Sequence, residues 1–283
     1  MTTPNLVPVQ ALADLVERDR VLVLDARFEL ADPARGERDH QRARVPRSAY
    51  LGLDRDLSDL SKRGLGRHPL PHDLVFSAAL ARAGWRPERD VVVYDDAQGA
   101  LAAARLWWLL RLAGQRNVAL LDGGWQAWVA AGLPTESGPA ASRDSDVQVS
   151  LDRAQVVWFD ELERRRASGD VLLVDARGAP RYRGEVEPID AVAGHVPGAV
   201  NRPFSDNLGG DGRFKPREQL RAEFERLLAG RPPRDVVHMC GSGVTACHNL
   251  FAMELAGLSG SRVFAPSWSG WIADPSRPVA TGA

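Results

Sequence analysis

The chain has 283 residues, of which 44% are hydrophobic and 26% are charged, and its formal net charge is -1. This length is enough for two domains of ordinary size, each with its own core. The near balance of 36 basic and 37 acidic residues argues against nucleic-acid binding, which usually needs a basic excess. Two cysteines are too few for a disulfide framework in a chain of this length.

The sequence also lacks the patterns of export and of membrane insertion. The first residues do not combine a basic start with an apolar core, as a signal peptide would. The most apolar run, residues 106–110, is too short to span a bilayer and lies between Arg105 and Arg111. We therefore expect a cytoplasmic protein with no membrane partner and no nucleic-acid partner.

Short apolar runs alternate with helical patterns along both halves of the chain. The first half predicts strands over residues 21–24, 91–94 and 119–121, and helices over residues 73–83 and 100–112. The second half predicts strands over residues 171–174, 236–239 and 262–264, and helices over residues 216–229 and 245–256. Uninterrupted apolar runs of this kind are typical of parallel strands buried on both faces. The predicted fold class is α/β, with two domains that each have a mainly parallel sheet flanked by helices.

Four segments of the first half recur in the second half in the same order. VLVLDAR from residue 21 returns as VLLVDAR from residue 171, and VPRSA from residue 45 returns as VPGAV from residue 196. VVVYDD at 91–96 parallels DVVHMC at 235–240, and WQAW at 125–128 parallels WSGW at 268–271. A spacing of about 150 residues is the size of a whole domain and indicates a duplicated domain rather than a solenoid.

The stretch from residue 133 to residue 146 is rich in Pro, Ser, Gly and charged residues, which is typical of a linker. We therefore predict a first domain over residues 1–135, a linker over residues 136–152 and a second domain over residues 153–283.

The strand predicted over residues 236–239 runs directly into Cys240, and a Gly-Ser-Gly turn separates this cysteine from the next helix. Gly241 and Gly243 let the backbone bend tightly and turn its N–H groups inward. The sulfur would then lie among backbone donors at a helix N-terminus, where a thiolate or a bound anion is stabilised. The first repeat has Asp95 at the matching place and so lacks a nucleophile there. A buried structural cysteine is the competing interpretation.

CGSGVT at residues 240–245 resembles the active-site loop of the two-domain rhodanese and 3-mercaptopyruvate sulfurtransferase family. The segments at 120–128, 175–185, 193–201 and 267–271 resemble further signatures of the same family, so that the resemblance covers nearly the whole chain. It implies two tandem rhodanese-like domains, of which only the second is catalytic.

The resemblance implies that Cys240 takes a sulfane sulfur from thiosulfate or 3-mercaptopyruvate and passes it, as a persulfide, to cyanide or a thiol. Covalent catalysis of this kind divides one difficult transfer into two easier steps. Arg181 matches the arginine that binds the anionic end of the donor, a task that suits a permanently charged guanidinium. We expect no cofactor and no metal. The loop residues that the resemblance implies as the cradle of the persulfide are Gly241, Ser242, Gly243, Val244 and Thr245.

Two departures from the family pattern concern the donor. Mercaptopyruvate enzymes carry a second substrate arginine, but Ile189 stands at that place. Thiosulfate enzymes carry basic residues directly after the cysteine, where Gly241 and Ser242 stand. The choice between the two donors therefore stays open.

A third departure concerns proton transfer. The family's histidine, which can form a Ser-His-Asp relay with the loop serine, is expected before the Val-Pro segment of the first domain, where Arg44 stands. Asp32 or Asp39 lies near the place of the relay aspartate. Ser242 is present without a recognisable histidine partner, so the sequence does not predict this relay.

The remaining candidate residues favour structural roles. His195, directly before a tight turn, is expected to be a structural hydrogen-bonding residue. His68 and His72 have the spacing of metal ligands, but the Pro-Leu-Pro between them excludes a shared helical face, so we predict no metal site. Cys247 is expected to pack in the core, and a resolving thiol is the alternative.

Two functions other than small-molecule sulfur transfer are alternatives for a chain with this loop. Dual-specificity phosphatases resemble this fold, but they need a longer loop with an arginine six residues after the cysteine, where Ala246 stands, so we disfavour that function. A protein-to-protein persulfide relay, with little turnover of small donors, would tolerate both the missing arginine and the missing histidine. Turnover of a small donor would distinguish an enzyme from such a relay.

Overall fold

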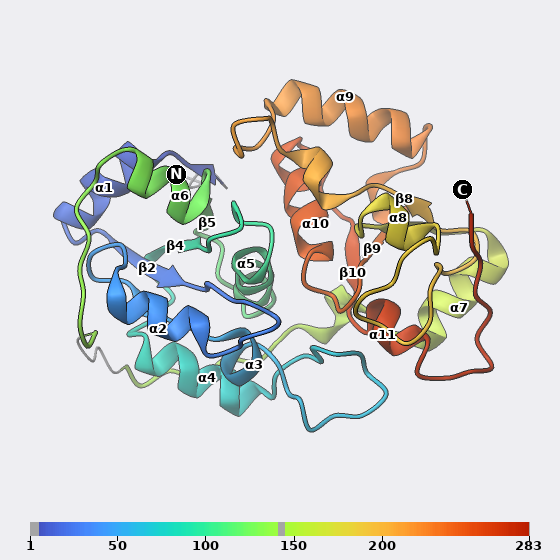
Figure 1. Ribbon diagram of the computed structural model, residues 1–283, viewed down its shortest axis with the longest axis horizontal. Coiled ribbons are helices and arrows are strands. Elements are labelled where there is room, and N and C mark those ends of the chain that lie inside the picture. The colour runs from blue at the N-terminus through green and yellow to red at the C-terminus, as the bar shows by residue number, and fades with distance from the viewer. Residues whose placement is uncertain (1–5, 141–144, 283) are drawn as a thin grey trace. The chain divides into compact units, whose positions relative to one another are not determined.

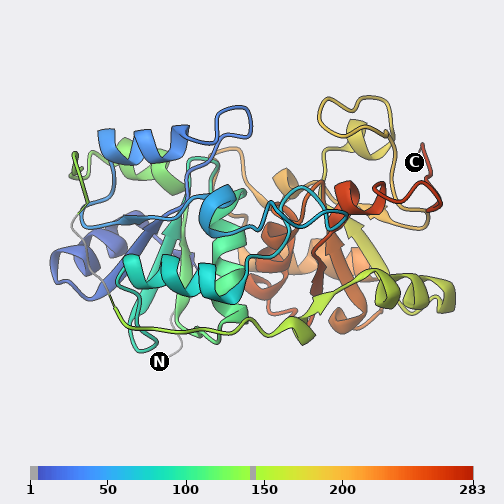
Figure 2. The ribbon, with the colours of Figure 1, turned by 90° about the horizontal axis from the view of Figure 1, so that it is seen from below.

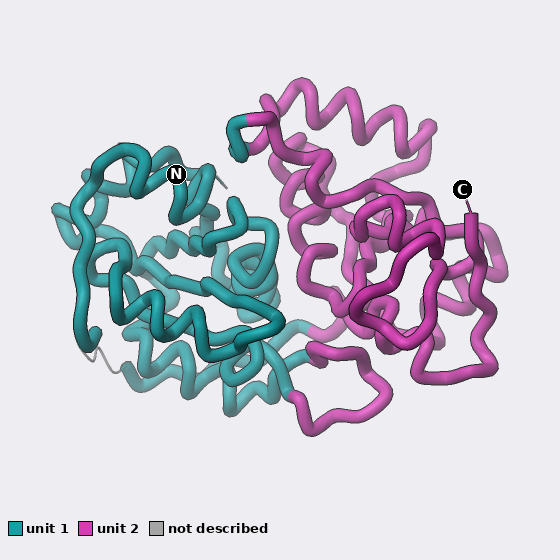
Figure 3. The backbone as a smooth tube through the Cα atoms, in the orientation of Figure 1, with its two compact units in different colours: residues 1–59, 70–152, 211–213 teal, residues 60–69, 153–210, 214–283 magenta. Residues whose placement is uncertain are grey.

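A computed structural model describes residues 6–140 and 145–282 of the chain, which divides into two compact units. Unit 1 comprises residues 1–59, 70–152 and 211–213, and unit 2 comprises residues 60–69, 153–210 and 214–283 (Figure 3). Residues 141–144 of the predicted linker lie outside the described residues. The segment 60–69 belongs to unit 2, although the chain on both sides of it belongs to unit 1.

Unit 1 contains a five-stranded sheet in the order β1-β5-β4-β2-β3, in which all pairings are parallel (Figure 1). Its strands are β1 (Leu6–Val7), β2 (Val21–Asp25), β3 (Ala49–Tyr50), β4 (Asp90–Tyr94) and β5 (Val118–Leu121). Its helices are α1 (Val9–Glu17), α2 (Arg35–Arg42), α3 (Leu53–Asp56), α4 (Asp73–Arg82), α5 (Ala102–Leu112) and α6 (Gly124–Ala130).

Unit 2 contains a second five-stranded parallel sheet, in the order β6-β10-β9-β7-β8. Its strands are β6 (Val156–Val157), β7 (Leu172–Asp175), β8 (Val200–Asn201), β9 (Val236–Met239) and β10 (Arg262–Phe264). Its α-helices are α7 (Phe159–Ser168), α8 (Ala179–Tyr182), α9 (Arg217–Leu228), α10 (Ala246–Leu255) and α11 (Ser267–Trp271). Its 3-10 helices are η1 (Arg153–Gln155), η2 (Phe204–Asn207) and η3 (Pro233–Asp235).

Each sheet is buried on both faces, as the uninterrupted apolar runs predict. In β2, Val21 and Val23 pack with α1 and α6 in one core cluster, and the alternate residues Leu22 and Leu24 are buried as well. Helices accordingly lie on both sides of the strands (Figure 2). The α/β fold class with two mainly parallel sheets is confirmed, and strands of only two residues, such as β1 and β8, are too short for a sequence pattern to reveal.

The sequence repeat corresponds to a repeated cluster of side chains. In unit 1, Arg27 forms a buried ion pair with Asp25 at 2.7 Å, and its guanidinium carbon lies 4.6 Å from the centroid of the Trp125 ring. Unit 2 reproduces both contacts at 2.7 Å and 4.6 Å, with Asp175, Arg177 and Trp268. The Asp-Ala-Arg and Trp motifs therefore serve the same packing in both halves, which supports duplication of one ancestral domain.

No helix among residues 6–140 and 145–282 is long and apolar enough to cross a bilayer.

Candidate active site

Cys240 lies at the carboxyl end of β9, in the turn that leads to α10, and only 2% of its surface is exposed. The N–H of Gly243 donates to Sγ of Cys240 at 3.1 Å. Gly243 has a φ of +77°, a conformation that glycine adopts without steric cost. The turn therefore presents a backbone donor to the sulfur, as the sequence predicts for a site that stabilises a thiolate or a persulfide.

The start of α11 holds this loop from the other side. Ser267 Oγ accepts the N–H of Cys240 at 3.1 Å, and the N–H of Trp268 donates to the Cys240 carbonyl at 2.9 Å. The N–H of Ser269 donates to the Gly241 carbonyl, also at 2.9 Å. The Ser-Trp-Ser-Gly-Trp segment thus fixes the backbone on both sides of the Cys240–Gly241 peptide, a role that its sequence alone does not show.

The segment 60–69 brings two further side chains to the same loop. The N–H of Arg67 donates to Ser269 Oγ at 2.9 Å. His68 Nδ1 lies 2.8 Å from Ser242 Oγ, and both residues are buried. An imidazole and a hydroxyl at this distance can exchange a proton, with the direction of donation set by the tautomer of His68. Sequence reasoning missed this pair, because it considered His68 only as a metal ligand.

Arg44, which stands where the sequence places the relay histidine, has a structural role. Its side chain is fully buried, and its Nη2 donates to Glu136 Oε1 at 2.6 Å. Its Nη1 donates to the Gly138 carbonyl at 2.5 Å. The two aspartates considered for the relay form exposed ion pairs instead, Asp32 with Arg38 and Asp39 with Arg35.

Arg181, on α8, lies beside the loop residue that follows Cys240. A Cβ atom built on Gly241 would be 3.7 Å from each of the terminal guanidinium nitrogens of Arg181. The Nε of Arg181 donates to Glu187 at 3.1 Å, and its Nη2 donates to Asp190 Oδ2 at 3.0 Å. Although burial opposes it, the hydrogen bonds from Arg181 and from two backbone N–H groups lower the pKa of Glu187. Arg181 is therefore a cation oriented toward the loop by two carboxylates.

Ile189, which stands at the place of the second substrate arginine, is 43% exposed. Its contribution to this region comes from its backbone, because its N–H donates to Glu187 Oε1 at 3.1 Å. The side chain at this position supplies no charge for an anionic donor.

His195 and Cys247 lie in structural settings. His195 Nδ1 is 2.8 Å from the Tyr182 carbonyl oxygen, and its ring stacks on the Tyr182 ring with centroids 3.9 Å apart. Cys247 is fully buried in α10, and its Sγ donates to the Gly243 carbonyl at 3.3 Å. Across the part of the chain that the structure describes, no group of three or more His, Cys, Asp or Glu residues is arranged to hold a metal ion.

Asp95 occupies the place in unit 1 that Cys240 has in unit 2. Burial raises the pKa of this carboxyl to about 6, although hydrogen bonds from the backbone lower it. The N–H donors, at 2.7 to 3.1 Å, belong to Ala97, Gly99, Leu101 and Ala103. The N–H groups of the unit 1 loop thus point at a side chain of that loop itself, at the place that Cys240 has in unit 2.

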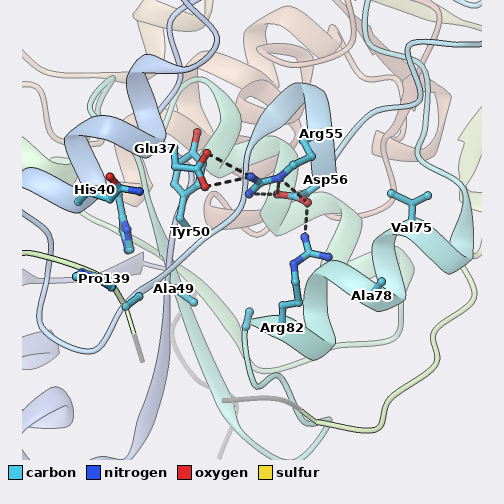
Figure 4. Close-up of a pocket in the computed structure, with 13 residues that line it drawn as sticks. Glu37, His40, Ala49, Tyr50, Arg55, Asp56, Val75, Ala78, Arg82 and Pro139 are labelled. Atoms are coloured by element: carbon cyan, nitrogen blue, oxygen red, sulfur yellow. Dashed lines mark hydrogen bonds and ion pairs between the residues drawn. The ribbon is translucent and has the colours of Figure 1, made fainter. Parts of the chain in front are cut away.

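Unit 1 also contains a cavity of about 620 Å³ between α2, α3 and α4 (Figure 4). Its charged side chains are paired with one another within the wall. Arg55 contacts Glu37 at 3.1 Å and Asp56 at 3.0 Å, and Arg82 contacts Asp56 at 2.6 Å. No cysteine lines this cavity among the described residues, so Cys240 remains the candidate nucleophile.

Comparison with known proteins agrees with the geometry. A family model described as the Rhodanese-like domain matches residues 8–131 and 159–274. The chain is 49% identical over 284 residues to a Pseudomonas aeruginosa protein named "Probable 3-mercaptopyruvate sulfurtransferase", with full coverage of both chains. It is 31% identical over 289 residues to the thiosulfate sulfurtransferase of Rattus norvegicus, covering 98% of this chain and 95% of the relative.

Among solved structures, 3-mercaptopyruvate sulfurtransferase from Leishmania major matches with a TM-score of 0.82 and 30% sequence identity, covering 93% of this chain and 73% of that chain. The two matched segments, the shared strand order of the two sheets and these relatives lead to one conclusion. The chain belongs to the rhodanese-like family and carries two tandem copies of its domain.

Proposed function

We propose that this sulfurtransferase takes the thiol sulfur of 3-mercaptopyruvate as the outer, sulfane sulfur of a persulfide on Cys240 and passes it to a thiol or cyanide. The observation that carries the proposal is the loop geometry, in which a buried sulfur at the end of β9 receives the N–H of Gly243 at 3.1 Å. A persulfide formed there would extend from a sulfur that already has a backbone donor. Thiosulfate is the second candidate donor, because relatives carry either name.

In the first step, the Cys240 thiolate attacks the thiol sulfur of 3-mercaptopyruvate. The S–S bond forms as the C–S bond breaks, and the electron pair of that bond remains on the methylene carbon as the enolate of pyruvate. The carbon must then gain a proton, and the donor thiol loses one. The His68–Ser242 pair can carry this proton from sulfur to carbon, because the imidazole and the hydroxyl are within hydrogen-bonding distance.

In the second step, the acceptor attacks the outer sulfur of the persulfide. The new bond joins that sulfur to the acceptor, and the electrons of the S–S bond return to Cys240 as a thiolate. The enzyme therefore begins and ends in the same oxidation state and needs no external oxidant or reductant.

We further propose that the catalytic cysteine belongs to the second domain, over residues 153–283, and that the first domain, over residues 1–135, supplies no nucleophile of its own, although its segment 60–69 contributes His68. Asp95 supports this division, because a carboxylate occupies the first loop. A cytoplasmic location would keep both buried cysteines, Cys240 and Cys247, as the free thiols that the structure contains.

Steady-state sulfur transfer to cyanide, measured separately with 3-mercaptopyruvate and with thiosulfate, tests the proposal. We expect a higher kcat/KM with 3-mercaptopyruvate and loss of turnover in Cys240→Ser. Preference for thiosulfate would contradict the choice of donor. If neither donor turned over while Cys240 still accepted a persulfide from another protein, the relay function would replace the enzymatic one.

A further inference from the structure

Two guanidinium groups lie beside the residue that follows the nucleophile. A Cβ atom built on Gly241 would be 3.2 Å from Nη2 of Arg67 and 3.7 Å from Nη1 of Arg181. Arg181 comes from α8, whereas Arg67 comes from the segment 60–69, far away in the sequence. Two cations from separate parts of the chain therefore converge on one side of the Cys240 loop.

One carboxylate holds both cations in place. Asp190 Oδ1 accepts a hydrogen bond from Nη1 of Arg67 at 2.5 Å, and its Oδ2 accepts one from Nη2 of Arg181 at 3.0 Å. The Asp190 side chain is 3% exposed, and the Arg67 backbone is fixed by its hydrogen bond to Ser269. A buried carboxylate that spans two guanidinium groups orients both of them, because each of its oxygens serves one arginine.

Each guanidinium keeps one nitrogen near Gly241 that the bridge does not use. Within residues 6–140 and 145–282, neither Nη2 of Arg67 nor Nη1 of Arg181 donates a hydrogen bond to a protein group. Nε of Arg67 is buried and also has no hydrogen-bond partner among these residues. Both arginines thus keep donors for an anion at the loop after Asp190 has taken one nitrogen from each.

We infer that Arg67 is a substrate-binding residue that joins Arg181 in binding the carboxylate of an α-keto acid donor. The inference rests on the proposed function, since the carboxylate belongs to 3-mercaptopyruvate. Arg67 supplies the second positive charge that Ile189 does not, from a different segment of the chain. Arg181 alone offers mainly Nη1, because its Nε and Nη2 already donate to Glu187 and Asp190, so Arg67 adds donors for the remaining oxygens of the donor.

The rate of persulfide formation on Cys240, followed by intact-protein mass after mixing with 3-mercaptopyruvate, tests this assignment. Arg67→Gln should lower kcat/KM for persulfide formation by about 10- to 100-fold, the effect of losing a hydrogen bond to a charged group. Arg67→Lys should restore part of the rate, because it restores the charge. Arg63→Gln, at an exposed arginine of the same segment, is the matched control and should not change the rate.

The second half-reaction separates substrate binding from a structural role. Enzyme sulfurated in advance should transfer its sulfur to a neutral thiol at the same rate in Arg67→Gln as in the wild type. An equal loss in both half-reactions, or a rate of persulfide formation within about twofold of the wild type, would overturn the assignment.

Binding of pyruvate provides a readout that does not depend on turnover. In the Cys240→Ser background, where no persulfide can form, Arg67→Gln should weaken pyruvate binding by a similar factor, measured by titration calorimetry. A wild-type protein that bound pyruvate through Arg67 but formed no persulfide would contradict the proposed function alone. A protein that formed persulfide with and without Arg67 at the same rate would contradict this inference alone.

Discussion

His68 and Ser242 form a contact whose contribution depends on the donor. Protonation of the pyruvate enolate at carbon needs a proton carrier, whereas sulfite leaves thiosulfate as a stable anion. We therefore expect His68→Gln to slow persulfide formation from 3-mercaptopyruvate by about 100-fold or more. The rate from thiosulfate should change much less, and single-turnover mass measurements with both donors check this difference.

Ser242→Ala provides the second arm of that test, since it removes the other member of the 2.8 Å contact. It should show the same dependence on the donor as His68→Gln. If both variants slowed the reactions of the two donors equally, the His68–Ser242 pair would support the packing of the Cys240 loop and would not transfer a proton.

The local part of the site could be predicted from sequence, and the long-range part could not. The apolar run of β9, the Gly-Ser-Gly turn and the following helix are adjacent in the chain, so they place Cys240 without knowledge of the fold. His68 is 174 residues away from Ser242, and a glycine-rich loop has no periodic pattern that would reveal its partners. The family pattern led instead to Arg44, because it places the histidine directly before the Val-Pro segment of the first domain.

Among the secondary elements, the segment 60–69 has a distinct role because it carries both Arg67 and His68 to unit 2. Gly66 lies directly against Pro266, the residue before α11. A Cβ atom at Gly66 would lie 2.4 Å from the Pro266 carbonyl oxygen, and the residue has a φ of +91°. Any side chain at this position must displace the segment from the start of α11.

Gly66→Ala should therefore lower kcat/KM for the sulfur donor by about 10-fold or more, because it shifts an arginine and a histidine together. Gly64→Ala is the matched control, since Gly64 also has a positive φ, +75°, but has nothing within 4 Å of a built Cβ. Both variants carry a comparable cost of about 1 kcal/mol in backbone strain. Equal activities of the two variants would show that the contact at Pro266 does not position the segment.

For the whole molecule, duplication has produced two sheets of the same strand order with different contents in the corresponding loops. Unit 1 carries the carboxylate of Asp95 where unit 2 carries the sulfur of Cys240. The longer strands of both sheets correspond to apolar runs in the sequence, and for this reason the α/β class was predictable, whereas the strand order and the two-residue strands were not. The chemistry of each loop depends on one residue and its neighbours in space.

The stability of the whole molecule should depend on pH through two buried histidines. Burial lowers the pKa of both His238 and His248 to about 3, so the folded chain keeps them neutral. The unfolded chain binds these protons near pH 6.5. The free energy of unfolding should therefore fall as pH decreases from about 6.5 towards 3, by about 1.4 kcal/mol per pH unit for each histidine.

Urea unfolding at pH 7, 6 and 5 checks this expectation by comparing the wild type with His238→Leu. The variant loses the contact of Nε2 with Ser261 Oγ at 3.2 Å. Its stability should decline less steeply with acid, because one titrating group is gone. Parallel pH profiles of the two proteins would contradict a neutral, buried His238.

Formation of a persulfide on Cys240 is the claim on which the whole account depends. Intact-protein mass, followed by peptide mapping, should show one added sulfur on Cys240 after incubation with 3-mercaptopyruvate, and its removal on addition of a thiol. Cys247→Ala, which changes the other cysteine, should retain the added sulfur, and Cys240→Ser should lack it. Sulfur found on Cys247, or on neither cysteine, would contradict the account.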